Sequence, residues 1–282
     1  IEKAVVKEFS MSLKLMYITN NPEIAKIAED SGVDRIFVDM EFIGKSARQG
    51  GMDTVQNHHT IQDVEKIRNV VDKSEVLVRI NPIHKNVAGY MDSKEEINSA
   101  IEAGADILML PYFKTPEAVA EFVELVNGRA VTLPLLESIN AVERLDEILN
   151  IDGIDQIHIG LNDLSLDLGK KFMFEILANG FVDEICEKIK EQRIPFGFGG
   201  FGRVGQGMLP AEKIIKEHYR LGSQCSILSR SFCNTSVITD LKEIQKIFED
   251  GVKEIRDYEK TCVDGFEKNH QELVKIVRGI VQ

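Results

Sequence analysis

Two carboxylates stand where short apolar runs of the sequence end. Glu137 closes the strand-like part of AVTLPLLES (130–138), and Asp163 closes QIHIGLND (156–163), so we expect them at the ends of consecutive strands. Carboxylates projecting from neighbouring strands can bind Mg²⁺ or Mn²⁺, because these ions take oxygen ligands and leave positions for water or substrate. Each carboxylate could equally pair with an Arg or Lys at the rim, and Asp163 could instead cap a helix. Spacing alone leaves these interpretations open.

A basic residue ends a third apolar run. Arg79 lies in EVLVRIN (75–81), where a buried guanidinium would most naturally clamp a carboxylate or a phosphate through two parallel hydrogen bonds. The alternative is a structural ion pair with Asp39 or Glu41, which close the run RIFVDME (35–41).

The glycine-rich run and the histidines give weaker evidence for a functional site. The run GFGGFGRVGQG (197–207) could bring backbone N–H groups close to an anion, but no Gly-Lys-Ser/Thr follows, so it is not a Walker loop. His58 and His59 are adjacent in a predicted loop, where most histidines are simply solvated. His158 lies inside a predicted strand, and we expect it in the core.

Eight β-rich runs alternate with amphipathic helical stretches. We expect strands at 13–19, 35–41, 75–81, 105–113, 130–138, 156–163, 195–200 and 224–232. Runs such as ADILML and QCSIL are continuously apolar, which is typical of parallel strands buried on both faces. No glycine fingerprint follows the first run, as an open doubly wound sheet would favour. The sequence therefore predicts an α/β fold, a single (β/α)₈ TIM barrel, with its reactive groups at the C-terminal ends of the strands.

The end of the chain exceeds the eight units. We expect residues 1–258 to form the barrel catalytic domain and residues 259–282 to form an extra C-terminal helical extension. Its helical spacing suits a docking or oligomer-forming helix as well as a solvated helical end.

Composition narrows the class of protein. The chain has 34 Lys and Arg against 46 Asp and Glu, a net charge of −12, which argues against a nucleic-acid surface. Its 4 cysteines lack CxxC spacing, which favours reduced thiols in a cytosol. No signal peptide is visible, nor any apolar run of about 18 residues that would suit a membrane span. We expect a cytoplasmic homo-oligomer without a nucleic-acid or membrane partner.

These segments resemble the HpcH/HpaI aldolase and citrate lyase β-subunit family, within the phosphoenolpyruvate/pyruvate barrel superfamily. The similarity spans roughly Leu15 to Phe232 and includes RIFVDME, VLVRIN, AGADILMLP, LPLLES, GIDQIHIGLNDLSLDLG and SILSRSF. Its most specific piece is GLNDLSLDLG, in which Asp163 follows Glu137 by 26 positions. This looks like the family's Glu plus G-x-x-D-L-S metal site.

The resemblance implies metal-dependent aldol chemistry on pyruvate or acyl-CoA enolates. By position, Glu137 and Asp163 would ligate Mg²⁺, Mn²⁺ or another divalent metal. Arg79 would stabilise the enolate oxygen, and Glu41 would order water at the metal. The substrate carboxylate would be held by backbone N–H groups of Gly160, Leu161, Asn162 and Asp163.

Two positions depart from the family pattern. Pyruvate aldolases carry D-x-E-H, with the histidine implicated as the base, whereas this chain has Phe42 after Glu41. The polar residue that aldolases often place two positions before the metal-binding glutamate is Leu135 here. The remaining candidates for proton transfer are water at the metal, Glu41, His58, His59 and Lys45.

Three functional hypotheses follow. The leading one is a metal-dependent carbon–carbon lyase that forms or cleaves a 4-hydroxy-2-oxo acid through a pyruvate enolate, with a pyruvate-like oxo acid and an aldehyde as partners. The second keeps the enolate but acts on a malyl or citramalyl thioester or in a phosphoenolpyruvate-type reaction, although nothing marks a CoA site. The third is a barrel that binds an oxo acid without turnover, which Phe42 favours and the intact set of Glu137, Asp163 and Arg79 opposes.

Overall fold

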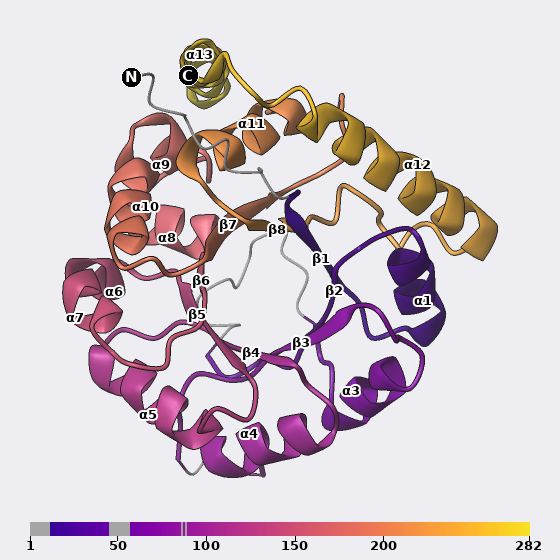
Figure 1. The fold of residues 1–282 in the computed structure, drawn as a ribbon, viewed down its shortest axis with the longest axis vertical. Coiled ribbons are helices and arrows are strands. Elements are labelled where there is room, and N and C mark those ends of the chain that lie inside the picture. Colours follow the sequence, from indigo (N-terminus) through magenta and orange to yellow (C-terminus); the bar gives the residue numbers. More distant parts are fainter. Residues whose placement is uncertain (1–11, 45–56, 86, 88) are drawn as a thin grey trace, which may run out of the picture.

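Eight parallel strands close into a barrel (Figure 1). The computed structural model describes residues 12–44, 57–85, 87 and 89–282. The strands are β1 (Lys14–Ile18), β2 (Arg35–Asp39), β3 (Glu75–Arg79), β4 (Ile107–Leu110), β5 (Val131–Leu136), β6 (Ile157–Ile159), β7 (Phe196–Phe201) and β8 (Cys225–Leu228). Each expected run contains one strand, with β7 extending one residue further, so the predicted (β/α)₈ barrel is confirmed.

Helices surround the barrel (Figure 1). They are α1 (Pro22–Asp30), α3 (Ile61–Arg68), α4 (Ser93–Glu102), α5 (Pro116–Val126), α6 (Ile139–Glu143), α7 (Leu145–Leu149), α8 (Leu161–Asp167), α9 (Glu175–Ala178), α10 (Phe181–Glu191), α11 (Ala211–Leu221), α12 (Leu241–Glu259) and α13 (Phe266–Val281). Side-chain caps determine where several of these helices begin. Asn21 accepts from the N–H groups of Glu23 and Ile24, and Thr60 forms a capping box with Asp63.

Both faces of the barrel wall are apolar. Met16, Phe37 and Leu77 belong to a small cluster inside the barrel. Their strand neighbours, such as Ile36 and Val38, belong to the large cluster between the strands and the helices. Because successive strand residues point to opposite faces, a strand buried on both sides needs a continuous apolar run. The barrel interior is therefore packed, and polar groups are left for its ends.

Strand register brings the candidate residues to one end of the barrel. Asp39 on β2 pairs with Arg79 on β3. Leu136 on β5 pairs with Ile159 on β6, so the next residue of each strand, Glu137 and Gly160, continues at the same level. Since all strands are parallel, their C-terminal ends form a single mouth.

The sixth strand is shorter than predicted. We expected a strand over 156–163, but β6 ends at Ile159 and α8 begins at Leu161. Asp163 therefore lies in the first turn of a short helix rather than at the end of a strand. Gly160 occupies the N-cap position, so Asp163 is not the cap either. The apolar run continues through the turn because Leu161 and Leu164 pack into the core, which hides the boundary from a periodicity argument.

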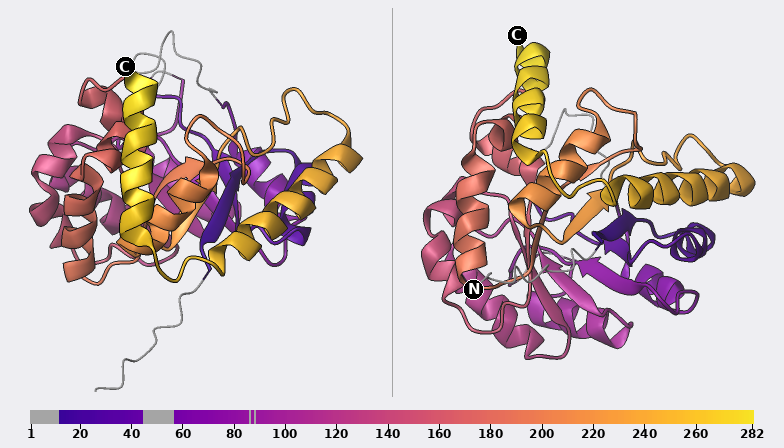
Figure 2. Two further views of the ribbon diagram at one scale, coloured as in Figure 1. Left: turned by 90° about the horizontal axis from the view of Figure 1, so that it is seen from above. Right: turned by 45° about the horizontal axis from the view of Figure 1, so that its top comes forward.

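The C-terminal helix docks on the barrel. Figure 2 shows α13 beside α11 and α9, whereas α12 runs along the side of α1. Leu273 and Val277 are buried in this contact, and Asn269 donates to the backbone oxygen of Lys213 at 3.0 Å. Of the two alternatives for this segment, the structure has the docked helix. The division at residue 258 stays a prediction, and α12 runs one residue past it.

Two remaining features concern the cysteines and the membrane. All four cysteines are free and buried. Within the described ranges, none of the helices is both long enough and apolar enough to span a bilayer. Lys45, one of the proton-transfer candidates, falls in the segment 45–56, which is outside the described residues.

Candidate active site

Three carboxylates meet at the C-terminal mouth of the barrel. Glu137 follows β5 directly, Glu41 lies two residues after β2, and Asp163 lies in the first turn of α8. They are buried, with exposed fractions of 5%, 1% and 6% respectively. The negative charges of Asp163 and Glu41 both act on Glu137, so the three side chains share one electrostatic environment. The structure thus brings together the carboxylates that the sequence singled out.

This environment opposes a third negative charge. Burial raises the pKa of Glu137 most, the charges of Asp163 and Glu41 raise it further, and the result is about 8. Arg79 and the N–H of Tyr112 lower the pKa by less. A divalent cation between Glu137 and Asp163 would offset the repulsion and replace lost hydration. Buried carboxylate oxygens with excess negative charge fit a hard cation such as Mg²⁺ or Mn²⁺.

Two backbone features place the Glu137 carboxylate. The N–H of Tyr112 donates to Oε1 at 2.9 Å, and Tyr112 adopts a left-handed conformation (φ 42°) that non-glycine residues rarely adopt. A Cβ on Gly160 would lie 2.9 Å from Oε2, so only glycine leaves room for the carboxylate there. The role of Tyr112 depends on its backbone N–H, so the side chain gives no sign of it in the sequence.

Arg79 is committed to a neighbouring carboxylate. Its Nε and Nη2 each donate to Asp39 at 2.8 Å, one to each carboxylate oxygen, and its Nε lies 3.4 Å from Oε2 of Glu41. The ion pair that we considered as the alternative for Arg79 is therefore present. Among the described residues, Nη1 has no hydrogen-bond partner, so one edge of the guanidinium remains for a ligand at the mouth. The acids around it hold the pKa of Arg79 above its usual range despite burial.

Asp39 is fixed from the opposite side by the segment before α3. Asn57 Nδ2 donates to Asp39 Oδ2 at 2.9 Å, and the N–H of Asp39 donates to Nδ1 of His59 at 2.9 Å. Because Nδ1 accepts, the neutral ring carries its proton on Nε2. His59 is therefore a hydrogen-bond donor at Nε2 in this arrangement, which disfavours it as the base. Its adjacent residue His58 is exposed.

Phe42 occupies the position at which the resemblance to pyruvate aldolases predicts a histidine. Its ring packs edge-to-face on Tyr90 with a centroid distance of 4.9 Å. It lines a cavity of about 470 Å³ together with His58, Ile61 and Met91, residues of α3 and the loops beside it. The side chain contacts Tyr90 although it is 39% exposed, and it offers no proton carrier.

His158 is a core residue, as predicted. It is 1% exposed, its Nε2 lies 3.2 Å from the carbonyl oxygen of Gly199, and burial lowers its pKa to about 4. The ring is therefore neutral near pH 7.

The glycine-rich run packs against its own barrel. A Cβ on Gly200 would lie 2.7 Å from the carbonyl oxygen of Ile227 on β8, and Gly197 meets the backbone of Cys225 even more closely. These two glycines permit close strand pairing. The sequence left open whether this run approaches a ligand, and at these two positions the structure shows a structural role.

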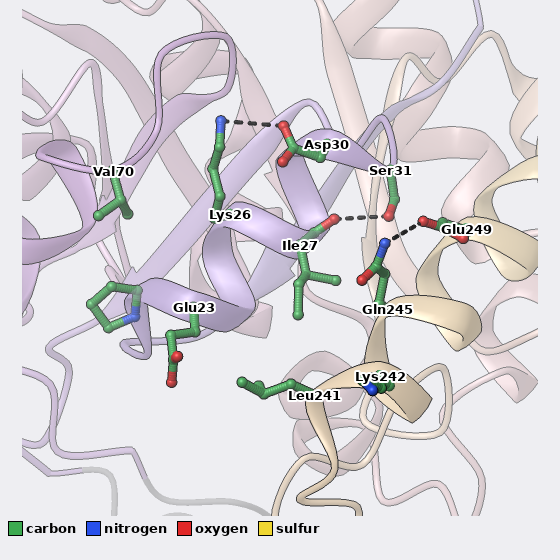
Figure 3. Close-up of a pocket in the computed structure, with 11 residues that line it drawn as sticks. Glu23, Lys26, Ile27, Asp30, Ser31, Val70, Leu241, Lys242, Gln245 and Glu249 are labelled. Carbon is green, nitrogen blue, oxygen red and sulfur yellow. Dashed lines mark hydrogen bonds and ion pairs between the residues drawn. The ribbon is translucent and has the colours of Figure 1, made fainter.

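Cavities lie both at the mouth and outside the barrel. One of about 400 Å³ lies at the ends of β1 and β8, with Thr19, Asn57, His59 and Ser229 among its lining residues. Another, of about 490 Å³, lies between α1 and α12 and is lined by paired side chains such as Lys26 with Asp30 and Gln245 with Glu249 (Figure 3). The first of these two adjoins the charged mouth, because Asn57 and His59 both contact Asp39.

A larger set of protein ligands is not present in the described part of the chain. No three or more His, Cys, Asp or Glu side chains there form a group able to hold a metal ion. A site made of Glu137 and Asp163 would have two protein ligands, with water and substrate oxygens as the others.

The fold and the acidic mouth define a (β/α)₈ barrel with a charged active-site end. A family model described as HpcH/HpaI aldolase/citrate lyase matches residues 14–175, more than half of the chain. The chain belongs to the HpcH/HpaI aldolase/citrate lyase family.

The curated relatives share about a quarter of the aligned residues with this chain. A 2-keto-3-deoxy-L-rhamnonate aldolase of Escherichia coli is 25% identical over 198 residues, which cover 59% of this chain and 66% of the relative. A hydroxypyruvate/pyruvate aldolase of Sagittula stellata is 26% identical over 103 residues, covering 26% of this chain and 41% of the relative. The chain thus spans less than two thirds of the length of these relatives.

Solved structures share the fold. A HpcH/HpaI aldolase/citrate lyase family protein from Burkholderia cenocepacia has a TM-score of 0.61 and 16% identity, covering 83% of this chain and 95% of that chain. A HpcH/HpaI aldolase from Desulfitobacterium hafniense has a TM-score of 0.58 and 18% identity, covering 83% and 93%. At these identities the likeness shows the fold alone.

Proposed function

We propose that this protein is a divalent-metal-dependent aldolase that forms or cleaves a 4-hydroxy-2-oxo acid through a pyruvate enolate. Membership of an aldolase/lyase family gives the coarse class. The names of the relatives, which include a hydroxypyruvate/pyruvate aldolase, support a pyruvate-type oxo acid as one substrate. The cytoplasm as its compartment and a homo-oligomeric state are part of the same proposal.

The charge balance at the mouth carries the proposal. Four buried carboxylates, those of Asp39, Glu41, Glu137 and Asp163, surround one arginine. Asp39 and Glu41 both lie against Arg79, while burial and the negative charges of Asp163 and Glu41 raise the pKa of Glu137 to about 8. A divalent cation beside Glu137 would offset this repulsion, so the arrangement favours a bound cation.

Each residue then has a distinct task. Glu137 and Asp163 would hold Mg²⁺ or Mn²⁺, and the bound ion would supply electrophilic stabilisation of the developing enolate oxygen. The free Nη1 edge of Arg79 would donate to the same oxygen. The substrate carboxylate would bind to N–H groups of Leu161, Asn162 and Asp163 in the turn that begins α8. The N–H of Gly160, which we also expected there, instead donates to the carbonyl oxygen of Leu136 at 2.9 Å.

Proton transfer falls to Glu41 in this proposal. Phe42 carries no titratable group, and Nε2 of His59 already carries the proton of the neutral ring. Glu41 is 1% exposed and adjoins Arg79. In this proposal its carboxylate takes a proton from the methyl carbon as the enolate forms and returns a proton to that carbon in the reverse step. The aldehyde would occupy the cavity at the ends of β1 and β8, which has room for a small molecule.

The test is exchange of the methyl protons of pyruvate with D₂O, followed by NMR. We expect exchange with Mg²⁺ or Mn²⁺, none after chelation, and a loss of about a hundredfold or more in Glu137→Gln. Glu143→Gln, an exposed substitution on α6, is the matched control and should exchange normally. Exchange that survives both chelation and Glu137→Gln would overturn the proposal. Tight pyruvate binding without exchange would instead support a non-catalytic oxo-acid-binding barrel.

A further inference from the structure

Asn81 ties the end of β3 to the segment that carries Glu41. Its side chain is completely buried. Oδ1 accepts hydrogen bonds from the N–H groups of Phe42 and Ile43, both at 2.9 Å. Nδ2 lies 3.4 Å from the carbonyl oxygen of Met40, to which it donates. One side chain therefore holds the backbone on both sides of Glu41.

Asn81 is itself held from behind by α4. Its Nδ2 donates to Oε1 of Glu96 at 2.8 Å, and its backbone N–H donates to the same oxygen at 3.1 Å. The hydroxyl of Tyr90 adds a third hydrogen bond to this oxygen at 3.1 Å. Both lone pairs of Oδ1 and both hydrogens of Nδ2 are thus used, which leaves the amide of Asn81 a single orientation.

The residue that supports Asn81 is Glu96, a buried glutamate of α4. Glu96 is completely buried and lies on the inward face of α4 with Ile97 and Ala100. An acid on an apolar helix face carries a desolvation cost. Asn81 and Tyr90 satisfy Oε1, whereas Oε2 is buried and has no hydrogen-bond partner among the described residues, and burial raises the pKa of Glu96. In the sequence, Glu96 is marked only by its position among the apolar residues of this helix face.

This network links the backbone around Glu41 to the strand that carries Arg79. Arg79 and Asn81 are two residues apart on β3 and its extension, and Glu41 Oε2 lies 3.4 Å from Arg79 Nε. We infer that Asn81 is a positioning residue for Glu41: it holds the backbone on either side of Glu41 so that the carboxylate faces Arg79 and the other mouth carboxylates. This inference rests on the proposed function, in which Glu41 moves the proton.

The first experiment compares pyruvate proton exchange in Asn81→Ala with the unmodified protein. A misplacement of about 1 Å can cost about a hundredfold in rate, so we expect kcat for exchange to fall roughly 10- to 100-fold. The KM for pyruvate and the affinity for Mn²⁺ should change by less than about threefold, because Asn81 touches neither in the proposal. Asn150→Ala is the matched control: its amide also donates to a backbone oxygen, that of Asp146 at 2.8 Å, but on the surface.

The second experiment is a double-mutant cycle with Glu41→Gln. If Asn81 acts through Glu41, adding Asn81→Ala to Glu41→Gln should lower the exchange rate by less than about threefold, since neighbours in one network are not additive. A purely structural Asn81 would give the full fold-loss in both backgrounds, and that result overturns the inference. Asn81→Ser also removes the amide that contacts Met40, Phe42 and Ile43 but leaves a hydroxyl in the buried site, so it replaces the alanine variant, with the same expectation, if that variant does not fold.

The outcomes separate the two claims. Absence of metal-dependent exchange in the unmodified protein overturns the proposed function, and the inference falls with it. Normal exchange in the unmodified protein, together with multiplicative losses in the cycle, overturns the role of Asn81 and leaves the proposed function standing.

Discussion

Gly160 lies so close to Glu137 that a Cβ at position 160 would be 2.7 Å from the Cβ of Glu137. The same added atom would be 3.3 Å from Cδ1 of Leu135. It would therefore crowd two side chains, the apolar Leu135 on β5 and the acidic Glu137 directly after this strand. Gly160 has φ −84°, a value open to any residue, so space rather than backbone conformation requires glycine here.

Gly160→Ala should therefore act through the carboxylate. We expect a destabilisation of about 1–3 kcal/mol from overpacking and a loss of at least about tenfold in metal-dependent exchange, because Glu137 must move. Urea unfolding and the NMR exchange assay measure the two effects. Gly279→Ala is the control, since a Cβ there meets no atom within 4 Å, and helix propensity predicts a gain of about 0.5–1 kcal/mol. Unchanged exchange in Gly160→Ala would contradict the proposed place of Glu137.

Arg79→Lys should impair the site although it conserves charge. A lysine cannot reproduce the two hydrogen bonds to Asp39, whose side chain is 0% exposed, and it has no planar edge for a ligand. We expect a loss of about 1–3 kcal/mol in the free energy of unfolding and about a hundredfold in exchange. Arg144→Lys, on an exposed pair with Glu147, should change unfolding by less than about 1 kcal/mol. Equal effects of the two substitutions would argue against a special role for Arg79.

Glu29 predicts how stability falls in acid. Burial opposes its ionisation, but the Lys26 ammonium and three backbone N–H groups, those of Ser74, Lys73 and Asp72, outweigh burial and lower its pKa to about 2. The folded-state pKa thus lies below the ordinary value of 4.5. The stabilisation is present above pH 4.5 and is lost as the pH falls toward 2.

Glu29→Gln should accordingly destabilise by about 1–3 kcal/mol at pH 7, with a smaller difference from the unmodified protein at pH 3. Chemical unfolding at both pH values measures the difference, and Glu23→Gln, exposed on the same helix, is the control. If the difference in the free energy of unfolding stayed constant across this pH range, ionisation of Glu29 would not stabilise the contact between α1 and the turn before β3.

The docked helix α13 makes its own prediction. Leu273 is completely buried against the barrel helices, so Leu273→Ala should lower the free energy of unfolding by about 2–4 kcal/mol. Lys275→Ala, on the exposed side of α13, should change it by less than about 0.5 kcal/mol. Thermal or urea unfolding distinguishes them. If the two variants were equally stable, α13 would not be part of the cooperative fold.

The sequence was most informative where one local pattern repeats. Eight apolar runs predicted eight strands because a barrel strand is buried on both faces, and Thr60 marked a helix start through its cap. It was least informative between Ile159 and Leu161, where the apolar run passes from β6 into α8 without a break. Periodicity over three residues cannot separate a strand from a helix, so Asp163 was assigned to the wrong element.

By itself the sequence determined the barrel and the end of it at which Glu137, Asp163 and Arg79 lie. Only the tertiary structure decided their partners. It paired Arg79 with Asp39, turned the Nδ1 of His59 toward the backbone, and placed Asn81 behind Glu41. These choices depend on distances of about 3 Å between residues up to 40 positions apart, such as Asp39 and Arg79, and strand register, which no local pattern encodes, sets those distances.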